Sequence, residues 1–316
     1  MTSKFPLDRS AKLYIAGHRG MVGSAIWREA ERQGFTNLVG RSSKELDLTD
    51  RKAVFEFFAQ DQPKYVALAA AKVGGILANE TFPVDFLSEN LQIQVNTMDA
   101  ALEYGVERLL FMGSSCIYPK FAPQPITEDS LMTGHLESTN DAYAIAKIAG
   151  IKQVQSVRKQ HHKNWISVMP TNLYGPGDNY SEQGSHVLPA LIRRFETARL
   201  EGHERVTNWG TGSPMREFLY VDDLAEASLF LMENHDGDQQ VNVGVGEDLT
   251  IKELASLVAS EVGYRGEIEW DTSKPDGTPR KLLDVAKIHE MGWQAKTSLK
   301  DGIRLAIADY RNRIAV

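Results

Sequence analysis

The sequence predicts an α/β fold in which a doubly wound parallel sheet carries a smaller C-terminal cap. Short apolar runs alternate with helical patterns up to about residue 175, which is typical of parallel strands joined by crossover helices. The first apolar run ends in a glycine-rich turn, and beyond residue 175 the elements become short and interrupted. We therefore expect a sheet domain at residues 1–175 and a cap at residues 176–316.

Composition limits the class of protein. The chain has 316 residues, 42% of them hydrophobic and 24% charged, as in an ordinary globular protein of one large or two modest domains. A net charge of −7 argues against general nucleic-acid binding. The single cysteine excludes an intrachain disulfide and a cysteine-based zinc cluster, and we expect no metal site. No run approaches the ~20 apolar residues of a membrane span, and the first ten residues lack a signal core, so we expect a cytoplasmic protein.

The first element is an apolar strand at residues 12–16, followed by a helical pattern at residues 24–33. The glycines between them are spaced G-x-x-G-x-x-G. Such a turn brings the backbone close to a pyrophosphate and places the phosphate at a helix N-terminus, although a plain strand–helix turn is the alternative. We expect a dinucleotide to contact every residue of this turn: Gly17, His18, Arg19, Gly20, Met21, Val22 and Gly23.

The second strand should end within residues 37–44. An acidic side chain there would bind the ribose hydroxyls of NAD, but none occurs before Glu45. Arg41 and Lys44 stand there instead, with Arg19 in the glycine turn nearby. These cations indicate a 2′-phosphate and hence NADP, the alternative being solvated surface charges.

The remaining elements follow in order. The sheet domain should continue with a helix capped at 47–50, a buried strand at 65–71, a helix at 83–104, a strand at 108–112, a helix at 141–161 and a strand at 164–169. The cap should contain a helix from 185, a loop at 209–216, a strand at 217–220, a helix capped by Asp222 and Asp223, a capping box at 250–253, a loop at 271–280 and a last helix from about 298. We expect a strand near 241–244 to return to the first sheet.

Reactive side chains gather after the strand at 108–112. Ser114 and Cys116 follow its carboxyl end, where ligands bind in such sheets. Tyr143 and Lys147 are four residues apart in a helical pattern and so share one face. A cation beside a phenol favours the phenolate, so the pattern predicts that Lys147 lowers the pKa of Tyr143 to form an acid–base pair.

Gly17-x-x-Gly20-x-x-Gly23, Ser114 and Tyr143-x-x-x-Lys147 together resemble the extended short-chain dehydrogenase/reductase family of sugar-nucleotide enzymes, and the resemblance spans essentially the whole chain. Longer blocks are similar to the branch of this family that makes GDP-L-fucose; they lie at residues 17–23, 70–76, 113–119, 169–176 and 274–281.

The resemblance implies a bifunctional, NADP-dependent epimerase-reductase. It would invert C3 and C5 of GDP-4-keto-6-deoxy-D-mannose and reduce the C4 ketone with NADPH to give GDP-L-fucose. Ser114 and Tyr143 would hold the ketone oxygen, and Lys147 would also hold the nicotinamide ribose. Cys116 would act as a thiolate base, with His186 supplying the complementary proton.

Binding residues also follow from the resemblance. Trp209 would stack on the base, Arg216 would grip the diphosphate, and Arg194 and Asp276 would bind further parts of the substrate. His186 would also contact the cofactor, whose nicotinamide would be lined by Pro170, Thr171, Asn172 and Leu173. Some family members carry a second arginine where this chain has Ser43, so NADP binding rests on Arg19 and Arg41. The family pairs subunits through its long helices, which implies a homodimer.

Three other functions occur on the same fold and are less consistent with these residues. A sugar-nucleotide 4-epimerase would keep NAD bound and would not need Cys116 or His186. A 4,6-dehydratase usually has an acidic pair directly after the serine, where this chain has Ser115 and Cys116. A non-catalytic NADP-binding regulator would typically lose the tyrosine or the lysine, and here Tyr143 and Lys147 both remain.

Overall fold

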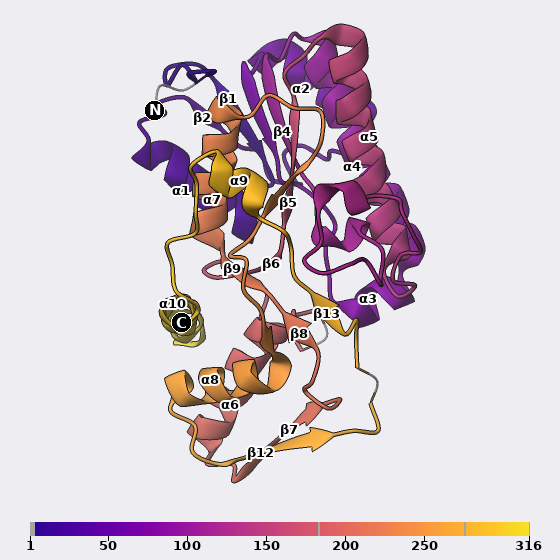
Figure 1. Cartoon of the computed structure of the whole chain (residues 1–316). Coiled ribbons are helices and arrows are strands. Elements are labelled where there is room, and N and C mark those ends of the chain that lie inside the picture. The colour runs from indigo at the N-terminus through magenta and orange to yellow at the C-terminus, as the bar shows by residue number, and fades with distance from the viewer. Residues whose placement is uncertain (1–3, 183, 275, 316) are drawn as a thin grey trace.

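The structure, a computed structural model, describes residues 4–182, 184–274 and 276–315. Figure 1 shows two lobes: an upper lobe built around the parallel sheet, and a lower lobe of helices and small sheets formed by the C-terminal half. Pro275, within the similar block at 274–281, lies outside the described residues. Within the described ranges, no helix is long and apolar enough to cross a bilayer.

The upper lobe contains a six-stranded, wholly parallel sheet in the order β10-β5-β4-β3-β1-β2. Because the strand order reverses between β1 and β3, ligands are expected above the carboxyl ends of these two strands. The central strands are buried along their whole length, as apolar runs covered on both faces should be. The strands are β1 Leu13–Ala16, β2 Leu38–Val39, β3 Tyr65–Leu68, β4 Arg108–Met112, β5 Ile166–Pro170 and β10 Val241–Val243.

Helices cover both faces of this sheet (Figure 1). On one face α1, Met21–Arg32, packs against α7, Val221–Asn234. On the other face α4, Pro83–Glu103, lies between α2, Arg51–Asp61, and α5, Asp141–His161. Asp50 caps α2 as predicted, since its side chain accepts a hydrogen bond from the backbone of Ala53 at 3.1 Å.

The lower lobe has its own core between three helices. Ile192 and Phe195 of α6 pack with Leu254 and Val258 of α8 and with Ile303 of α10. The helices are α6 Val187–Glu201, α8 Ile251–Val262 and α10 Leu299–Ile314, and the strands of the small sheets are β6 Asn172–Tyr174, β7 Arg205–Trp209, β8 Met215–Arg216, β9 Phe218–Tyr220, β11 Leu249–Thr250, β12 Glu267–Asp271 and β13 Arg280–Lys281.

The predicted capping box of α8 is confirmed, because Thr250 and Glu253 exchange side-chain-to-backbone hydrogen bonds. The strand at 241–243 does join the first sheet, beside β5. More of the C-terminal half returns with it than the sequence predicted: α7 and α9, Ala286–Glu290, also pack on the sheet lobe.

Some predicted boundaries are wrong. The second strand has only two residues, and the helix at 221–234 is capped by Tyr220, so Asp222 and Asp223 lie in its first turn. The predicted loop at 209–216 is flanked by β7 and β8. The sequence also gave no sign of α3, Ile76–Thr81, or of β12.

Candidate active site

The predicted reactive residues meet at the carboxyl end of β4. The chain turns there into a short 3-10 helix, Ser115–Ile117, whose N-cap is Ser114. The Ser114 hydroxyl accepts a hydrogen bond from the backbone of Cys116 at 3.3 Å, so the turn holds both side chains close together. Ser114 and Cys116 are both half-buried, and both therefore remain accessible to a ligand.

Tyr143 of α5 faces this turn. It is close enough to Ser114 and Cys116 for both to influence its phenol, and the Phe86 ring packs edge-on against it at 6.3 Å. Lys147 lies one helical turn away with its ammonium nitrogen 5.8 Å from the Tyr143 ring centre. The two side chains therefore share one helix face, as their spacing predicted.

The predicted effect of Lys147 on Tyr143 is wrong for this structure. Burial raises the pKa of Tyr143 above its ordinary value, the charge of Cys116 adds to this rise, and Ser114 only partly opposes it. Lys147 Nζ instead donates a hydrogen bond to the carbonyl of Met112 at 2.8 Å, at the end of β4. Because its side chain is almost fully enclosed, burial lowers the pKa of Lys147 to about 8.

The Cys116 thiol has polar neighbours besides Ser114. Asn140 Nδ2 lies 3.4 Å and Lys281 Nζ lies 3.6 Å from its sulfur. Burial alone would raise the pKa of the thiol, but the charge of Lys281 and the hydrogen bonds of Ser114, Lys281 and Asn140 outweigh it and leave the pKa below its ordinary value. Cys116 is therefore a partly accessible thiol with a lowered pKa and not a core residue.

His186 begins α6 at the mouth of the same region. It occupies the N-cap position, but its side chain caps nothing and is exposed. The protein still surrounds much of the imidazole, and this partial desolvation, together with the charge of Lys281, lowers the pKa of His186. The shared influence of Lys281 places His186 and Cys116 near one cation.

The four predicted substrate-binding residues lie on the lower lobe. Asp276 accepts hydrogen bonds from the backbone and the hydroxyl of Thr211, at 2.9 and 2.7 Å, which fixes the loop beside Trp209. The Trp209 ring is 65% exposed at the end of β7, so it offers a free face for stacking. Arg194 of α6 donates to Asn208 Oδ1 at 2.9 Å, next to this tryptophan.

Arg216 joins this group to the strand-end residues. Burial lowers the pKa of Arg216, and the charges of Cys116 and Glu137 partly oppose this lowering. The guanidinium therefore lies near the cysteine. A Cβ added at Gly277 would lie only 3.1 Å from Arg216 Nη2, so the guanidinium also touches the loop that holds Asp276. Arg216 thus lies between the residues after β4 and the loop that carries Asp276.

The glycine turn has the shape that a pyrophosphate needs. A Cβ at Gly23 would stand 2.1 Å from the carbonyl oxygen of Gly17, and Gly17 itself has a φ of +85°, so neither position accepts a side chain without strain. The N-cap of α1, Gly20, makes no side-chain cap, which leaves backbone N–H groups at the helix start to meet an anion. These features fit a dinucleotide phosphate.

The cations expected to select a 2′-phosphate lie beside this turn with different surroundings. Arg19 is exposed, whereas Arg41 donates to the carbonyl of Gly40 at 3.1 Å and to Asp61 at 3.4 Å. The His18 ring lies so close to Gly40 that a Cβ there would come within 2.4 Å of it. The end of β2 is thereby held against the glycine turn.

The segment predicted to line the nicotinamide continues from β5 into β6. The Thr171 hydroxyl and the Asn172 amide both donate to the carbonyl of Glu217, at 3.3 and 2.7 Å, so these side chains hold the segment in place. Pro170 is the last residue of β5, and Leu173 lies in β6. The predicted contact of this segment with the nicotinamide stays a prediction.

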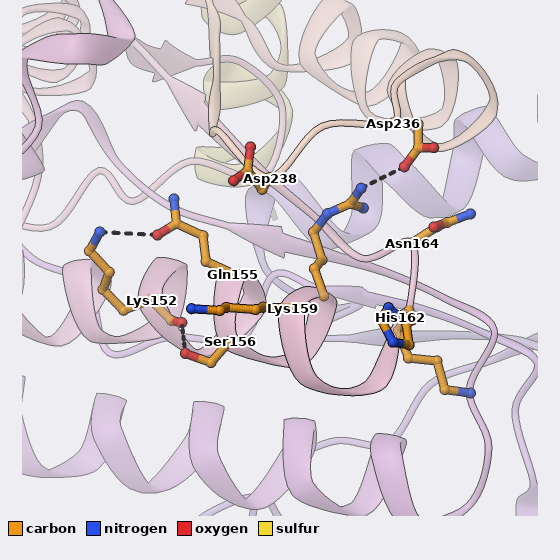
Figure 2. A pocket seen from close by; sticks show the side chains of 10 residues that line it. Lys152, Gln155, Ser156, Lys159, His162, Asn164, Asp236 and Asp238 are labelled. Atoms are coloured by element: carbon orange, nitrogen blue, oxygen red, sulfur yellow. Dashed lines mark hydrogen bonds and ion pairs between the residues drawn. The ribbon is translucent and has the colours of Figure 1, made fainter.

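A wide surface hollow lies elsewhere and has none of this chemistry. It is lined largely by the C-terminal part of α5, where Arg158 pairs with Asp236 at 2.6 Å and Lys152 donates to Gln155 at 3.0 Å (Figure 2). Arg158 is fifteen residues along the helix from Tyr143, or roughly 22 Å. Its exposed lysines are typical of a solvated helix end.

Sequence reasoning missed several side chains around Cys116. A small pocket beside the thiol is lined by Lys120, Glu137, Asn140 and Lys281. Lys120 and Glu137 form an ion pair at 2.9 Å. Lys281 lies in one of the similar blocks, but no local pattern connects it to a cysteine 165 residues earlier.

The chain is similar to known proteins over nearly its whole length. The NAD dependent epimerase/dehydratase family matches residues 13–244. GDP-L-fucose synthase 1 of Arabidopsis thaliana is 60% identical over 296 residues, which cover 94% of this chain and 92% of that protein. GDP-L-fucose synthase of Escherichia coli K12 is 52% identical over 301 residues, covering 92% and 94% respectively.

A solved structure extends the likeness to the whole fold. The GDP-L-fucose synthetase of Naegleria fowleri bound to NADP superposes with a TM-score of 0.91 at 27% identity, over 100% of this chain and 98% of that one. The matched range, residues 13–244, includes the glycine turn and also Ser114, Cys116, Tyr143 and Lys147. The chain belongs to the NAD dependent epimerase/dehydratase family.

Proposed function

We propose that this chain is a bifunctional enzyme that converts GDP-4-keto-6-deoxy-D-mannose into GDP-L-fucose. It inverts C3 and C5 of the sugar and then reduces the C4 ketone. The observation that carries the proposal is the position of Cys116, whose thiol has a lowered pKa and lies close to the Ser114 hydroxyl and to Tyr143. A base beside two ketone-binding hydroxyls is what inversion next to a ketone requires, and relatives at 60% and 52% identity are GDP-L-fucose synthases.

Inversion needs a proton removed from one face of the sugar and returned to the other. The Cys116 thiolate takes the proton from C3 or C5, and the electron pair moves toward the C4 oxygen to give an enolate. The hydroxyls of Ser114 and Tyr143 donate hydrogen bonds to that oxygen. Protonated His186 then gives its proton to the same carbon from the opposite face, which leaves a neutral thiol and a neutral imidazole to be reset by exchange with water.

Reduction uses the same ketone. NADPH, when bound, supplies the hydride for C4. Tyr143 gives its phenolic proton to the C4 oxygen, which is consistent with a raised pKa that keeps the phenol protonated. Lys147, with a pKa of about 8, lies beside Tyr143 and is placed to hold the nicotinamide ribose.

The two lobes divide the binding. Residues 1–175, with the strand near 241–244, hold NADP through the glycine turn, and Arg19 and Arg41 meet its 2′-phosphate. Residues 176–316 bind mainly the substrate: Trp209 stacks on the base, Arg216 binds the diphosphate, and Arg194 and Asp276 bind the remaining parts. The enzyme acts as a homodimer in the cytoplasm, with no membrane or nucleic-acid partner.

Another sugar nucleotide is the second candidate, because the strand-end residues recognise a ketone and not a particular base. Purified protein should therefore be assayed for NADPH oxidation at 340 nm with GDP-4-keto-6-deoxy-D-mannose, beside Cys116→Ser. We expect wild type to consume NADPH and yield GDP-L-fucose. In deuterated water, the mutant should exchange the C3 and C5 protons at least ~100-fold more slowly than wild type, because it lacks the general base.

Each other result shows which part of the proposal is wrong. Wild type that binds NADPH but leaves this substrate untouched acts on a different sugar nucleotide. A mutant that still inverts both centres shows that Cys116 is not the base. Retention of NADPH affinity in Cys116→Ser is the control for correct folding.

A further inference from the structure

The surroundings of the Cys116 sulfur are built from hydrogen-bond donors. Asn140 Nδ2 at 3.4 Å and Lys281 Nζ at 3.6 Å both point a donor at it. An ammonium group has no acceptor to offer, so a neutral thiol gains little from this neighbour. A thiolate accepts both contacts and gains the attraction of the positive charge.

Lys281 is free to act on the sulfur. The adjacent Lys120 is paired with Glu137 at 2.9 Å. By contrast, no carboxylate among residues 4–182, 184–274 and 276–315 forms an ion pair with Lys281. Its ammonium nitrogen contacts the cysteine sulfur at 3.6 Å, and no ion pair within these ranges cancels its charge.

The backbone holds Lys281 at this position from both sides. Its strand, β13, pairs in parallel with β8, and Arg280 binds Asp248 through two contacts at 2.6 and 3.0 Å. On the other side, the backbone of Leu282 donates to Gln124 at 2.8 Å and that of Leu283 to buried Glu217 at 3.1 Å. The cation is therefore delivered by a fixed strand and not by a free surface side chain.

Asn140 gives a second, independent indication. It occupies the N-cap position of α5, where an asparagine side chain usually accepts a backbone N–H, yet here it makes no cap and turns to the sulfur. Its Oδ1 atom is buried without a partner. Rotation of the amide would let Oδ1 accept the S–H of a thiol, so Asn140 suits the sulfur both before and after it takes a proton.

We propose that Lys281 and Asn140 are positioning residues that hold Cys116 as a thiolate ready to remove a proton. The role of this thiolate as a base rests on the function proposed above, whereas its stabilisation does not. The lowered pKa of Cys116 agrees, since Lys281 is the strongest influence opposing burial. The small pocket beside the thiol also has Lys120, Glu137, Tyr118 and Arg280 in its lining. Tyr143 of α5, Arg216 of β8 and His186 at the N-cap of α6 are the other titratable groups close enough to Cys116 or Lys281 for their charges to interact.

The chain has one cysteine, so alkylation by iodoacetamide reports on Cys116 alone. The rate should be measured from pH 5 to 10 by mass spectrometry for wild type, Lys281→Met, Lys281→Arg and Asn140→Leu. Only the thiolate reacts, so the midpoint of each profile gives the pKa of the thiol. NADPH binding by each variant serves as the test of folding.

We expect a wild-type midpoint below the ~8.5 of a free cysteine. Lys281→Met should raise it by about one unit, which is a tenfold slower alkylation at pH 7. Lys281→Arg keeps the charge and should stay near wild type, and Asn140→Leu should give a smaller rise. These results need no substrate, so they hold even if the enzyme proves to act on another sugar nucleotide.

Three outcomes would overturn the proposal. A wild-type midpoint at or above ~8.5 would mean that the thiolate is not stabilised at all. An unchanged midpoint in Lys281→Met, with a raised KM for the GDP-sugar, would assign Lys281 to the diphosphate of the substrate. A kcat that falls without any shift in the alkylation profile would equally exclude the proposed role.

Discussion

At the scale of single residues, the site combines groups whose environments push their proton affinities apart. Burial raises the pKa of Tyr143 and lowers that of Lys147 to about 8, while Lys281 helps lower that of Cys116. A thiol, a phenol and an ammonium group thus lie near one another with pKa values shifted in different directions. Such a separation is what the proposed combination of proton transfer and reduction requires.

Lys147 should cost the protein stability. Its folded pKa of about 8 lies below the ordinary 10.5, so the unfolded chain holds the proton more tightly. The penalty is complete below pH 8 and fades as the pH rises to about 10.5, because the side chain is then neutral in both states. Lys147→Met removes the buried charge but also the hydrogen bond to Met112, worth ~1 kcal/mol.

We therefore expect Lys147→Met to raise the free energy of unfolding at pH 7 by about 1–2 kcal/mol while abolishing ketone reduction. Urea denaturation at pH 7 and pH 9.5 checks this, and the gain should be smaller at the higher pH. Lys152→Met, an exposed lysine on the same helix, is the control and should change stability little. A mutant less stable than wild type at pH 7 would show that burial of this ammonium is not unfavourable.

The residues show what spacing can and cannot reveal. The four-residue interval was enough to place Tyr143 and Lys147 on one helix face. It could not show that the ammonium bonds the Met112 carbonyl, because that contact crosses from a helix to a strand end 35 residues away. The neighbours of Cys116 were invisible for the same reason, since Lys281 arrives from a distant strand.

At the scale of elements, the glycine turn makes a sharp prediction. A methyl group at Gly23 would overlap the Gly17 carbonyl, and backbone atoms cannot move aside as a flexible side chain can. We expect Gly23→Ala to weaken NADPH binding at least ~10-fold, because the turn must open and its phosphate-facing N–H groups shift. Fluorescence titration of NADPH at constant salt measures this.

Ser24→Ala is the matched control, because it places an alanine methyl group one residue after Gly23. The Ser24 hydroxyl donates to the carbonyl of Met21 at 3.1 Å and accepts from exposed Arg28 at 3.4 Å, and neither contact holds the glycine turn, so the affinity of Ser24→Ala for NADPH should stay within about twofold of wild type. Equal affinities for Gly23→Ala and Ser24→Ala would show that the phosphate is not bound at this turn.

The elements that the sequence missed share a physical cause. Central strands such as β4 are continuous apolar runs and are easily recognised. The pair β7 and β12 joins residues 205–209 to residues 267–271, and its buried positions include Asn208, so local periodicity carries little signal. Small sheets of this kind are defined by pairing between distant segments and not by their own composition.

At the scale of the whole molecule, the C-terminal half serves both lobes. It supplies β10 and α7 to the sheet lobe, and then β13, which brings Lys281 to the strand-end pocket. Buried Glu217 ties these parts together by accepting N–H bonds from Val245, Gly246 and Leu283. The active site therefore depends on correct seating of one lobe on the other, which a division at residue 175 alone would not suggest.

The outer surface of the sheet lobe supports the proposed homodimer. Helices α4 and α5 lie side by side (Figure 1), and they expose Val84 at 70%, Ile145 at 49% and Val95 at 37%. A second subunit packed over these helices would remove these apolar side chains from water. Two such pairs related by a two-fold axis would form a four-helix interface.

Ile145→Glu should break this dimer. In a two-fold interface each substitution occurs twice, so a cost of ~1 kcal/mol at each site raises the dissociation constant about 30-fold. Leu305→Glu on α10 is the matched control, since Leu305 is also 49% exposed but lies outside α4 and α5. Sedimentation velocity across a concentration series should show Ile145→Glu as a monomer and Leu305→Glu as a wild-type dimer. If both variants remain dimers, the subunits pair through another face, and a monomeric wild type would remove the homodimer altogether.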